Sequence, residues 1–294
     1  MKLAPEKRVL VAIGAMLSMW ASAFAGIRFS LLTFSPGELT LLRFLIASAA
    51  FGVIAVSCRL AKPRRKDLPM IALLGFFGIT FYHLALNYGE KTITAGAASL
   101  LVSSAPVFTT LLAAVILKEK PSLIGWLGTT IGLLGVAIIT LGEGGNLGLE
   151  PRAWVVLLAS ISSSLYTVIQ KQYVMRYPPM VFSAYTVWTG TVPLLIFMPS
   201  LLETLRAAPA AAIGTVVYLG IFPGCIAYIL WVYCLRHVPA SRLSSILYLN
   251  PVLAVFIAWL LLRETPGWLS LIGGAITIFG VALSNIGGRS GCSK

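Results

Sequence analysis

The sequence predicts an all-α integral membrane protein with ten transmembrane helices, arranged as two inverted five-helix repeats. Apolar residues make up 58% of the 294 residues and charged residues only 11%, about half the charged fraction that is usual in soluble domains. Apolar runs of roughly 20 residues, the length that crosses a hydrocarbon core about 30 Å thick, recur almost without interruption. In addition, the second half of the chain repeats the pattern of the first half.

Ten apolar runs follow one another, and each is expected to form one transmembrane helix. Their approximate bounds are 9–31, 38–58, 69–89, 95–117, 123–141, 153–173, 180–199, 211–234, 241–262 and 268–286. The first run resembles a secretory signal, because it follows a basic start and reaches small residues at 21–23. However, apolar residues continue past Ala25 to Leu32, so we expect an uncleaved first span. The loops leave no room for a soluble domain.

Basic residues are distributed unevenly between the loops. With the N-terminus inside, the cytoplasmic segments carry 16 Lys and Arg residues and the segments on the other side carry 5. The positive-inside rule then predicts that both termini are cytoplasmic, in a bacterial-type inner membrane. The net charge of +13 is explained by topology, and we expect no nucleic-acid partner. The densest basic run, RLAKPRRKD at 59–67, is a topology anchor that also suits anionic membrane lipid.

Signals for metal, cofactor or enzyme chemistry are lacking in the sequence. Cys58, Cys225, Cys234 and Cys292 show no metal-ligand spacing, and two of them lie within spans and two at the cytoplasmic side, so we expect no disulfide. The chain has no phosphate-binding loop with a Gly-Lys pair and no HExxH motif. We therefore expect no metal, no cofactor and no enzymatic activity.

Two stretches of the chain end alike: APVFTTLLAAVILKEKP, from Ala105 to Pro121, and NPVLAVFIAWLLLRETP, from Asn250 to Pro266. A shift of 145 residues superimposes them and also aligns several further glycines and aromatic residues. This pattern indicates a tandem duplication, with a first repeat over 1–145 and a second over 146–294. Because five spans per repeat is an odd number, the second repeat must enter the membrane in the opposite orientation. In transporters, such inverted repeats place the substrate site near the midplane, between the halves.

With these features, the chain resembles the EamA-type members of the drug/metabolite transporter superfamily. The resemblance rests on the ten spans, the tandem repeat and the AP…LKEKP and NP…LRETP signatures, and it covers roughly 9–286. Within that family the chain is most similar to the YddG-type exporters of aromatic and other amino acids. The resemblance implies export of metabolites or toxic compounds across the inner membrane without ATP. It also implies a central cavity lined mainly by spans 1, 3, 4, 6, 8 and 9, with spans 5 and 10 as peripheral scaffold.

Both repeats carry a proline within a predicted helix, Pro106 in span 4 and Pro251 in span 9. A proline in the body of a helix removes one backbone hydrogen bond and bends the helix. In a bilayer the freed carbonyl needs a partner, so such bends lie against protein or a wet cavity. Since both repeats keep the proline, we expect paired kinks that shape the cavity or act as hinges. The competing interpretation is that proline is simply common in membrane helices.

Polar and aromatic residues recur at helical spacing on several predicted spans. Because polar groups that face lipid are costly, we expect these faces to line a central cavity that binds the substrate. The candidates are Ser18, Trp20, Ser22, Tyr82, His83, Asn87, Ser99, Ser103, Tyr166, Gln170, Trp188, Tyr228, Ser244 and Tyr248. For any single serine or aromatic residue, helix packing is the competing interpretation. As a group, aromatic walls with a few polar groups suit amphipathic solutes or organic cations.

Three charged residues lie in or near the first two spans: Arg28, Glu38 and Arg43. Arg28 and Glu38 are expected towards the outer end, where they can pair across the short turn TFSPG. Arg43 lies about a turn and a half deeper, within reach of Glu38. A structural ion pair is the simpler interpretation, and an outer gate or an anchor for a substrate carboxylate is the alternative.

The sequence therefore predicts an exporter of small metabolites, with neutral amino acids, aromatic ones included, as the first candidate substrates. An exporter of drugs or organic cations is the second candidate. A nucleotide-sugar carrier is the third, because its anionic substrate would need more buried basic residues than Arg28 and Arg43. His83 is the only midspan group that titrates near neutral pH, so proton exchange and passive facilitation both stay open. The sequence does not distinguish a monomer from a homodimer.

Overall fold

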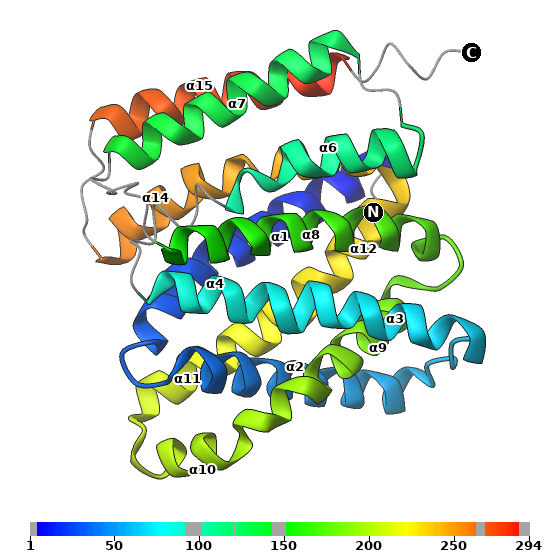
Figure 1. Ribbon diagram of the computed structural model, residues 1–294, viewed down its shortest axis with the longest axis vertical. Helices are drawn as coiled ribbons and strands as arrows, with labels where there is room; N and C mark the ends of the chain where they lie inside the picture. Colours follow the sequence, from blue (N-terminus) through cyan, green and yellow to red (C-terminus); the bar gives the residue numbers. More distant parts are fainter. Residues whose placement is uncertain (1–4, 92–101, 120–121, 143–150, 263–267, 288–294) are drawn as a thin grey trace.

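The described part of the chain is helical throughout (Figure 1). The computed structural model describes residues 5–91, 102–119, 122–142, 151–262 and 268–287, and these residues form no strand. The α-helices are α1 (Pro5–Ser30), α2 (Pro36–Cys58), α3 (Leu68–Gly75), α4 (Tyr82–Glu90), α6 (Ala105–Ile116), α7 (Leu123–Gly142), α8 (Pro151–Val174), α9 (Pro179–Thr191), α10 (Met198–Ala207), α11 (Ala210–Ile221), α12 (Ala227–His237), α13 (Ala240–Ile246), α14 (Leu249–Leu262) and α15 (Trp268–Gly287). Short segments precede or join some of these: the 3-10 helices η1 (Arg65–Asp67) and η3 (Val192–Phe197), and the π-helices η2 (Phe76–Phe81) and η4 (Phe222–Ile226).

Within the described residues, five helical stretches are long and apolar enough to cross a membrane, and each overlaps one predicted span. The five are Glu6–Ser30, Pro36–Cys58, Arg65–Glu90, Pro179–Ala207 and Ala210–His237. Shorter apolar helices overlap predicted spans 4, 5 and 10. Every predicted apolar run overlaps a helix in its described residues, and the count of ten crossings stays a prediction. Span 7 was expected to end near 199, but α10 continues the helical stretch to Ala207.

Helices α7 and α15 pack side by side at one edge of the bundle, and α10 lies at the other edge (Figure 1). Glycine makes the contact between α7 and α15 close: a Cβ atom on Gly135 would lie 2.6 Å from the backbone nitrogen of Thr277. Side chains of ordinary size would hold the two backbones apart, so small residues at this contact allow dense packing without polar groups. The pair therefore lies at the periphery of the bundle, away from its centre (Figure 1).

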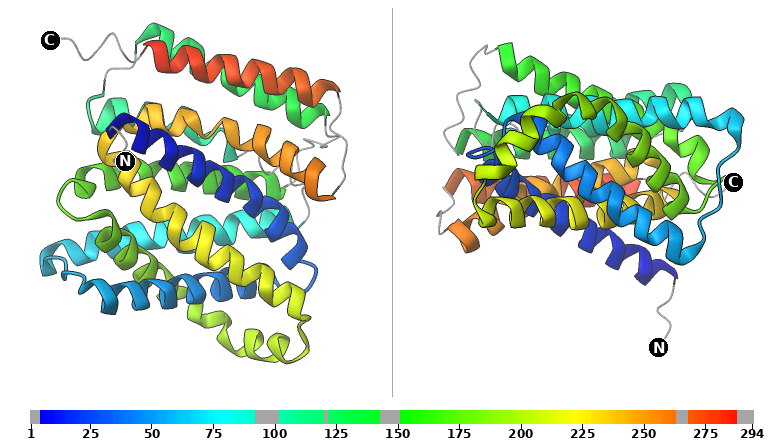
Figure 2. Two further views of the ribbon diagram at one scale, coloured as in Figure 1. Left: turned by 180° about the vertical axis from the view of Figure 1, so that it is seen from behind. Right: turned by 90° about the horizontal axis from the view of Figure 1, so that it is seen from below.

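Contacts between basic helix ends define one side of the bundle, called the basic side below. Lys171, near the end of α8, donates hydrogen bonds to the carbonyls of Leu235 and Val238, the second at 2.7 Å. Tyr177 follows α8 and donates to the carboxylate of Asp67, which precedes α3. Helix α1 begins and α15 ends on this same side in both views (Figures 1 and 2).

The opposite side is marked by Arg28, in the last turn of α1. Its Nη1 donates a hydrogen bond of 3.0 Å to the backbone carbonyl of Glu90, the last residue of α4. Helix α1 therefore runs from the basic side to the opposite side, whereas α8 runs towards the basic side and reaches it at Lys171 (Figure 1). The first helices of the two halves of the chain thus cross the bundle in opposite directions.

Candidate functional site

The third helical stretch of the first half widens into the π-helix η2, Phe76–Phe81. A π-helix contains one extra residue in a turn, which leaves backbone carbonyls without their usual partners. Side chains from two other helices satisfy them. Ser162 of α8 donates to the Phe77 carbonyl at 2.8 Å, and the hydroxyl of Tyr228 in α12 donates to the Gly78 carbonyl at 3.3 Å. The irregular turn thereby joins the two halves of the chain.

The corresponding stretch of the second half contains the π-helix η4, Phe222–Ile226. A shift of 145 residues carries Gly78 onto Pro223, so the two π-helices occupy matching positions. The partner again comes from the other half: the indole Nε1 of Trp20 in α1 donates to the Pro223 carbonyl at 3.3 Å. Each half of the chain therefore supplies a donor to the irregular turn of the other.

The two repeated prolines lie at helix starts and not in helix bodies, so the prediction of a kink within a continuous helix was wrong. Residues 103–104 form a turn, and Pro106 is the second residue of α6, which follows. Residues 247–248 form a turn between α13 and α14, and Pro251 is the third residue of α14. The first turn of a helix accepts proline because its N–H groups have no acceptor within the helix. The proline thus starts a new helix after a break.

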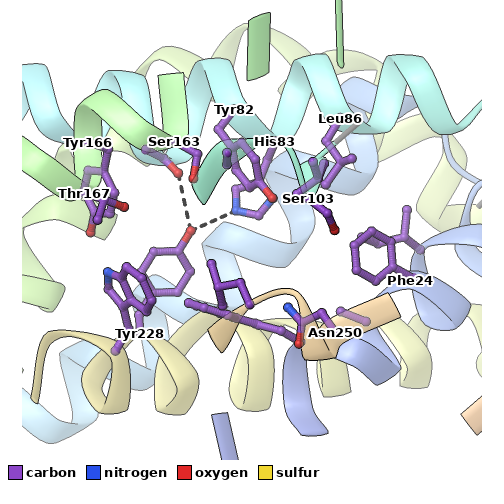
Figure 3. Close-up of a pocket in the computed structure, with 18 of the residues that line it drawn as sticks. Phe24, Tyr82, His83, Leu86, Ser103, Ser163, Tyr166, Thr167, Tyr228 and Asn250 are labelled. Carbon is purple, nitrogen blue, oxygen red and sulfur yellow. Dashed lines mark hydrogen bonds between the residues drawn. The ribbon is translucent and has the colours of Figure 1, made fainter. Parts of the chain in front are cut away.

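A cavity of about 100 Å³ lies where these breaks and the π-helices meet (Figure 3). Its apolar wall consists of Trp20, Ala23, Phe24, Ile27, Leu86, Val102, Ala105, Trp231 and Leu247. Its remaining wall consists of Arg43, Gly78, Tyr82, His83, Ser103, Ser163, Tyr166, Thr167, Tyr228 and Asn250. These residues come from the predicted spans 1, 3, 4, 6, 8 and 9, and span 2 adds Arg43. The volume admits several water molecules.

Aromatic and polar side chains lie together at both ends of the cavity. Tyr166 and Tyr228 lie towards one end, and Phe24 and Asn250 towards the other (Figure 3). His83 Nε2 lies 2.9 Å from the Tyr228 hydroxyl, which donates its proton to the Gly78 carbonyl. The hydroxyl therefore accepts from Nε2, which leaves Nδ1 of a neutral imidazole as an acceptor. Nδ1 has no hydrogen-bond partner among the described residues.

Arg43 brings a positive charge into the cavity wall. Its side chain is 2% exposed, and its guanidinium carbon lies 5.4 Å from the ring centre of Phe44. In the described part of the chain, its Nε has no hydrogen-bond partner, and no carboxylate oxygen lies within 4.0 Å of the guanidinium. A buried cation without an anionic partner is costly. The guanidinium is therefore suited to an anionic group that arrives with a ligand.

Six of the fourteen residues predicted to bind substrate line this cavity: Trp20, Tyr82, His83, Ser103, Tyr166 and Tyr228. Ser99 lies outside the described residues. The other seven are not part of its wall: Ser18, Ser22, Asn87, Gln170, Trp188, Ser244 and Tyr248.

Most of these seven have contacts within or between helices. The contacts are Ser18 with the Gly14 carbonyl, Ser22 with the Tyr218 hydroxyl, Asn87 with Thr40 and Trp188 with the Ser48 carbonyl. Tyr248 is fully buried and packs against α7, where a Cβ atom on Gly132 would lie 2.9 Å from its ring. Gln170 and Ser244 are buried as well. Tyr248 therefore packs between helices in this structure, as the competing interpretation has it.

The predicted ion pair between Arg28 and Glu38 does not form. Arg28 donates to the Glu90 carbonyl instead. Glu38 accepts a hydrogen bond of 2.9 Å from the backbone N–H of Ser35 and completes a capping box at the start of α2. A glutamate three residues after a serine is the signature of such a box, and this local bond competes with more distant partners. Arg43 lies at the cavity and not beside Glu38.

Several cavity residues were not predicted from the sequence. Asn250 is the clearest case, because it directly precedes the repeated proline and its Oδ1 has no partner among the residues described. Its position inside a repeated motif was the available signal. Ser163 and Thr167 are four residues apart on the face of α8 that also carries Tyr166. That spacing could have added them to the predicted set.

Known proteins resemble the chain over almost its whole length. The model of the EamA-like transporter family matches twice, over 7–141 and 152–286. The uncharacterized transporter YdfC of Bacillus subtilis is 42% identical over 277 residues, which cover 94% of this chain and 90% of that one. The probable terminal-alkyne amino-acid exporter of Streptantibioticus cattleyicolor is 39% identical over 266 residues, or 90% and 89% of the two chains.

A chain in a solved crystal structure has the same fold. It aligns with a TM-score of 0.77 over 98% of this chain and 99% of its own, at 20% sequence identity. This likeness concerns the fold alone, whereas the two family matches cover most of the sequence. The protein is therefore a multi-pass membrane transporter that belongs to the EamA-like transporter family.

Proposed function

We propose that this protein exports neutral amino acids, aromatic ones included, from the cytoplasm. The observation that carries the proposal is Arg43, the charged residue of the cavity wall, which has no anionic partner in the described part of the chain. A substrate carboxylate supplies that partner, because carboxylate and guanidinium form paired hydrogen bonds. One carboxylate balances one cation. A solute with several negative charges would leave most of its charge unpaired in this wall.

The rest of the cavity suits the remainder of such a substrate. Trp20 and Trp231, whose ring centres are 5.5 Å apart, and Phe24 offer flat apolar surfaces for a side chain. Asn250 Oδ1 and His83 Nδ1 have no partner among the described residues and suit polar groups of a ligand. The probable terminal-alkyne amino-acid exporter, 39% identical to this chain, supports this substrate class.

The proposed mechanism is alternating access between two inverted repeats, 1–145 and 146–294. It is supported by the opposite directions of α1 and α8 and by the matching π-helices. The breaks before Pro106 and Pro251 and the two π-helices are the proposed hinges, because irregular backbone changes shape with fewer lost hydrogen bonds than a regular helix. The basic side is the cytoplasmic side in this proposal, since positive-inside asymmetry assigns both termini to it.

The test is flux from liposomes that contain the purified protein. Vesicles are loaded with radiolabelled phenylalanine, threonine or methyl viologen, and efflux is followed for the wild type and Arg43→Gln. We expect phenylalanine efflux in the wild type and at least a tenfold loss in the variant. Arg206→Gln, which changes an exposed arginine of α10, is the matched control and should behave as wild type. Phenethylamine, which lacks the carboxylate, should compete poorly with phenylalanine.

The aromatic wall favours a second candidate, an exporter of organic cations. The flat ring faces of Trp20 and Trp231 attract positive charge. Efflux of methyl viologen alone, unaffected by Arg43→Gln, would establish this second function and refute the first. Selective efflux of a nucleotide sugar would refute both, because one buried arginine is a poor match for a diphosphate.

A further inference from the structure

Glu90 is a buried carboxylate that the mechanism above does not use. It is the last residue of α4, and its side chain is 0% exposed. Neither of its carboxylate oxygens has a hydrogen-bond partner among the described residues. An anion buried without hydrogen bonds is costly, so this group requires either a proton or a cationic partner.

The neighbours of Glu90 form a polar cluster between α1, α2 and α4. Arg28 approaches from α1 and donates to the Glu90 backbone carbonyl at 3.0 Å. Arg43 approaches from α2, and no nitrogen of either arginine lies within 4.0 Å of the carboxylate oxygens of Glu90. One turn earlier on α4, Asn87 is fully buried, with its amide donating to Thr40 at 2.8 Å and its Oδ1 without a partner in the described chain. Three acceptor oxygens of this cluster therefore have no hydrogen-bond partner among the described residues.

The cluster continues the wall of the cavity towards the opposite side. Leu86 and Arg43 line the cavity, and Glu90 follows Leu86 by four residues, so it lies on the same face of α4 one turn further out. A substrate that leaves the cavity along this face meets Glu90 next. Arg43 and Glu90 form no ion pair with each other, so each charge is available to the opposite charge of a ligand.

We propose that Arg43 and Glu90 together hold the zwitterionic headgroup of the substrate, and that Glu90 exchanges a proton for the substrate ammonium group. This inference rests on the proposed function. Arg43 binds the carboxylate, while the oxygens of Glu90 and Asn87 accept from the ammonium group. When the substrate binds from the cytoplasm, the proton on Glu90 leaves to the cytoplasm. When the substrate leaves on the other side, a proton from that side returns to Glu90, so one proton enters for each amino acid exported.

Arg28, Arg43 and Tyr82 are the titratable groups close to Glu90, and Tyr82 lies on the cavity wall. Helix α8 also packs against α4, but its Lys171 contacts carbonyls on the basic side. His83, on α4 itself, shares a hydrogen bond with Tyr228. Exchange of a proton for an ammonium group at one carboxylate couples the two fluxes, because the two cations cannot bind together.

The test is the steady-state phenylalanine gradient that a proton gradient sustains in liposomes. The outside is set one pH unit more acidic than the inside, and the membrane potential is clamped at zero. One proton exchanged per substrate then sustains about a tenfold concentration ratio, because one pH unit corresponds to a factor of ten. We expect this ratio for the wild type and for Glu203→Gln, which changes an exposed glutamate of α10. For Glu90→Gln we expect a ratio near one, with exchange of labelled for unlabelled phenylalanine slowed but still measurable, because the amide oxygen accepts from the ammonium group more weakly than the carboxylate does.

A second measurement follows protons directly. Phenylalanine is added to detergent-solubilised protein in weak buffer with a pH indicator, and we expect proton release from the wild type but not from Glu90→Gln. A wild type that exchanges phenylalanine but sustains a ratio near one overturns this inference and leaves the proposed function intact. A wild type that moves no amino acid overturns both. If Glu90→Gln cannot exchange at all, Glu90→Asp must sustain a ratio above one, and its failure to do so while exchanging also overturns the inference.

Discussion

Glu119, after the end of α6, holds the start of α13 on the basic side. Its carboxylate accepts from the backbone N–H groups of Ala240 at 3.1 Å and Ser241 at 3.3 Å, and from the Ser241 hydroxyl at 2.7 Å. The first N–H groups of a helix have no acceptor within the helix, and a negative charge is favourable there. Because the contact joins the first half of the chain to the second, its loss is expected to favour opening towards the basic side.

The expected free-energy change between the closed and open forms follows from the three hydrogen bonds that Glu119→Ala removes. Loss of a helix cap costs about 1 kcal/mol, and the additional bond from the Ser241 hydroxyl contributes about 1 kcal/mol. The sum of about 2 kcal/mol corresponds to roughly a 30-fold shift between the closed and open forms, since 1.4 kcal/mol is a factor of ten. Water that replaces the carboxylate reduces this value, so it is an upper estimate.

The assay measures access to the cavity from the basic side. Ser103, on the cavity wall, is replaced by cysteine in a variant without the native cysteines, and inside-out vesicles are treated with a membrane-impermeant thiol reagent. We expect Glu119→Ala to raise the labelling rate by up to about 30-fold. Glu6→Ala, which removes an exposed glutamate from the first turn of α1, is the matched control. Equal labelling rates in the two variants would refute the reasoning that Glu119 keeps the basic side closed.

Two further predictions concern glycines that accept close neighbours. A Cβ atom on Gly78 would lie 2.5 Å from the ring of Tyr166, so Gly78→Ala should push this ring into the cavity and slow phenylalanine efflux several-fold in liposomes. A Cβ atom on Gly135 would lie 2.6 Å from the backbone nitrogen of Thr277, so Gly135→Ala should destabilise the contact between α7 and α15 by about 1–3 kcal/mol and lower the midpoint of thermal unfolding in detergent. Gly214→Ala, where no atom lies within 4 Å, is the control for both, and indistinguishable results from it would contradict either prediction.

Features that repeat in the sequence were the ones that could be predicted from it. The apolar runs predict helices, because in the lipid interior the backbone can form hydrogen bonds only with itself. The duplicated motifs predicted an irregularity at both Pro106 and Pro251. The predicted form, a kink within a continuous helix, was wrong. A proline within an apolar run is compatible with either a kink or a new helix start. The structure has the second form, with a turn before each new helix.

Features that depend on contacts between distant residues could not be predicted. Tyr248 was expected at the cavity, but Gly132 on α7 leaves a space that its ring fills. Arg28 and Glu38 are close in sequence and opposite in charge, yet a local cap and a backbone carbonyl are their partners. Sequence spacing alone does not rank such competing partners, because each contributes only about 1 kcal/mol.

The matching π-helices also record the history of the chain. A π-helix arises when one residue is inserted into an α-helix. An insertion in only one repeat would change the shift between the repeats by one residue at that point. The shift is instead 145 on both sides, from Gly75 to Gly220 before the irregular turn and from Tyr88 to Tyr233 after it. The simplest history is that the inserted residue was already present in a single ancestral five-helix unit, and that gene duplication later copied it together with its surroundings.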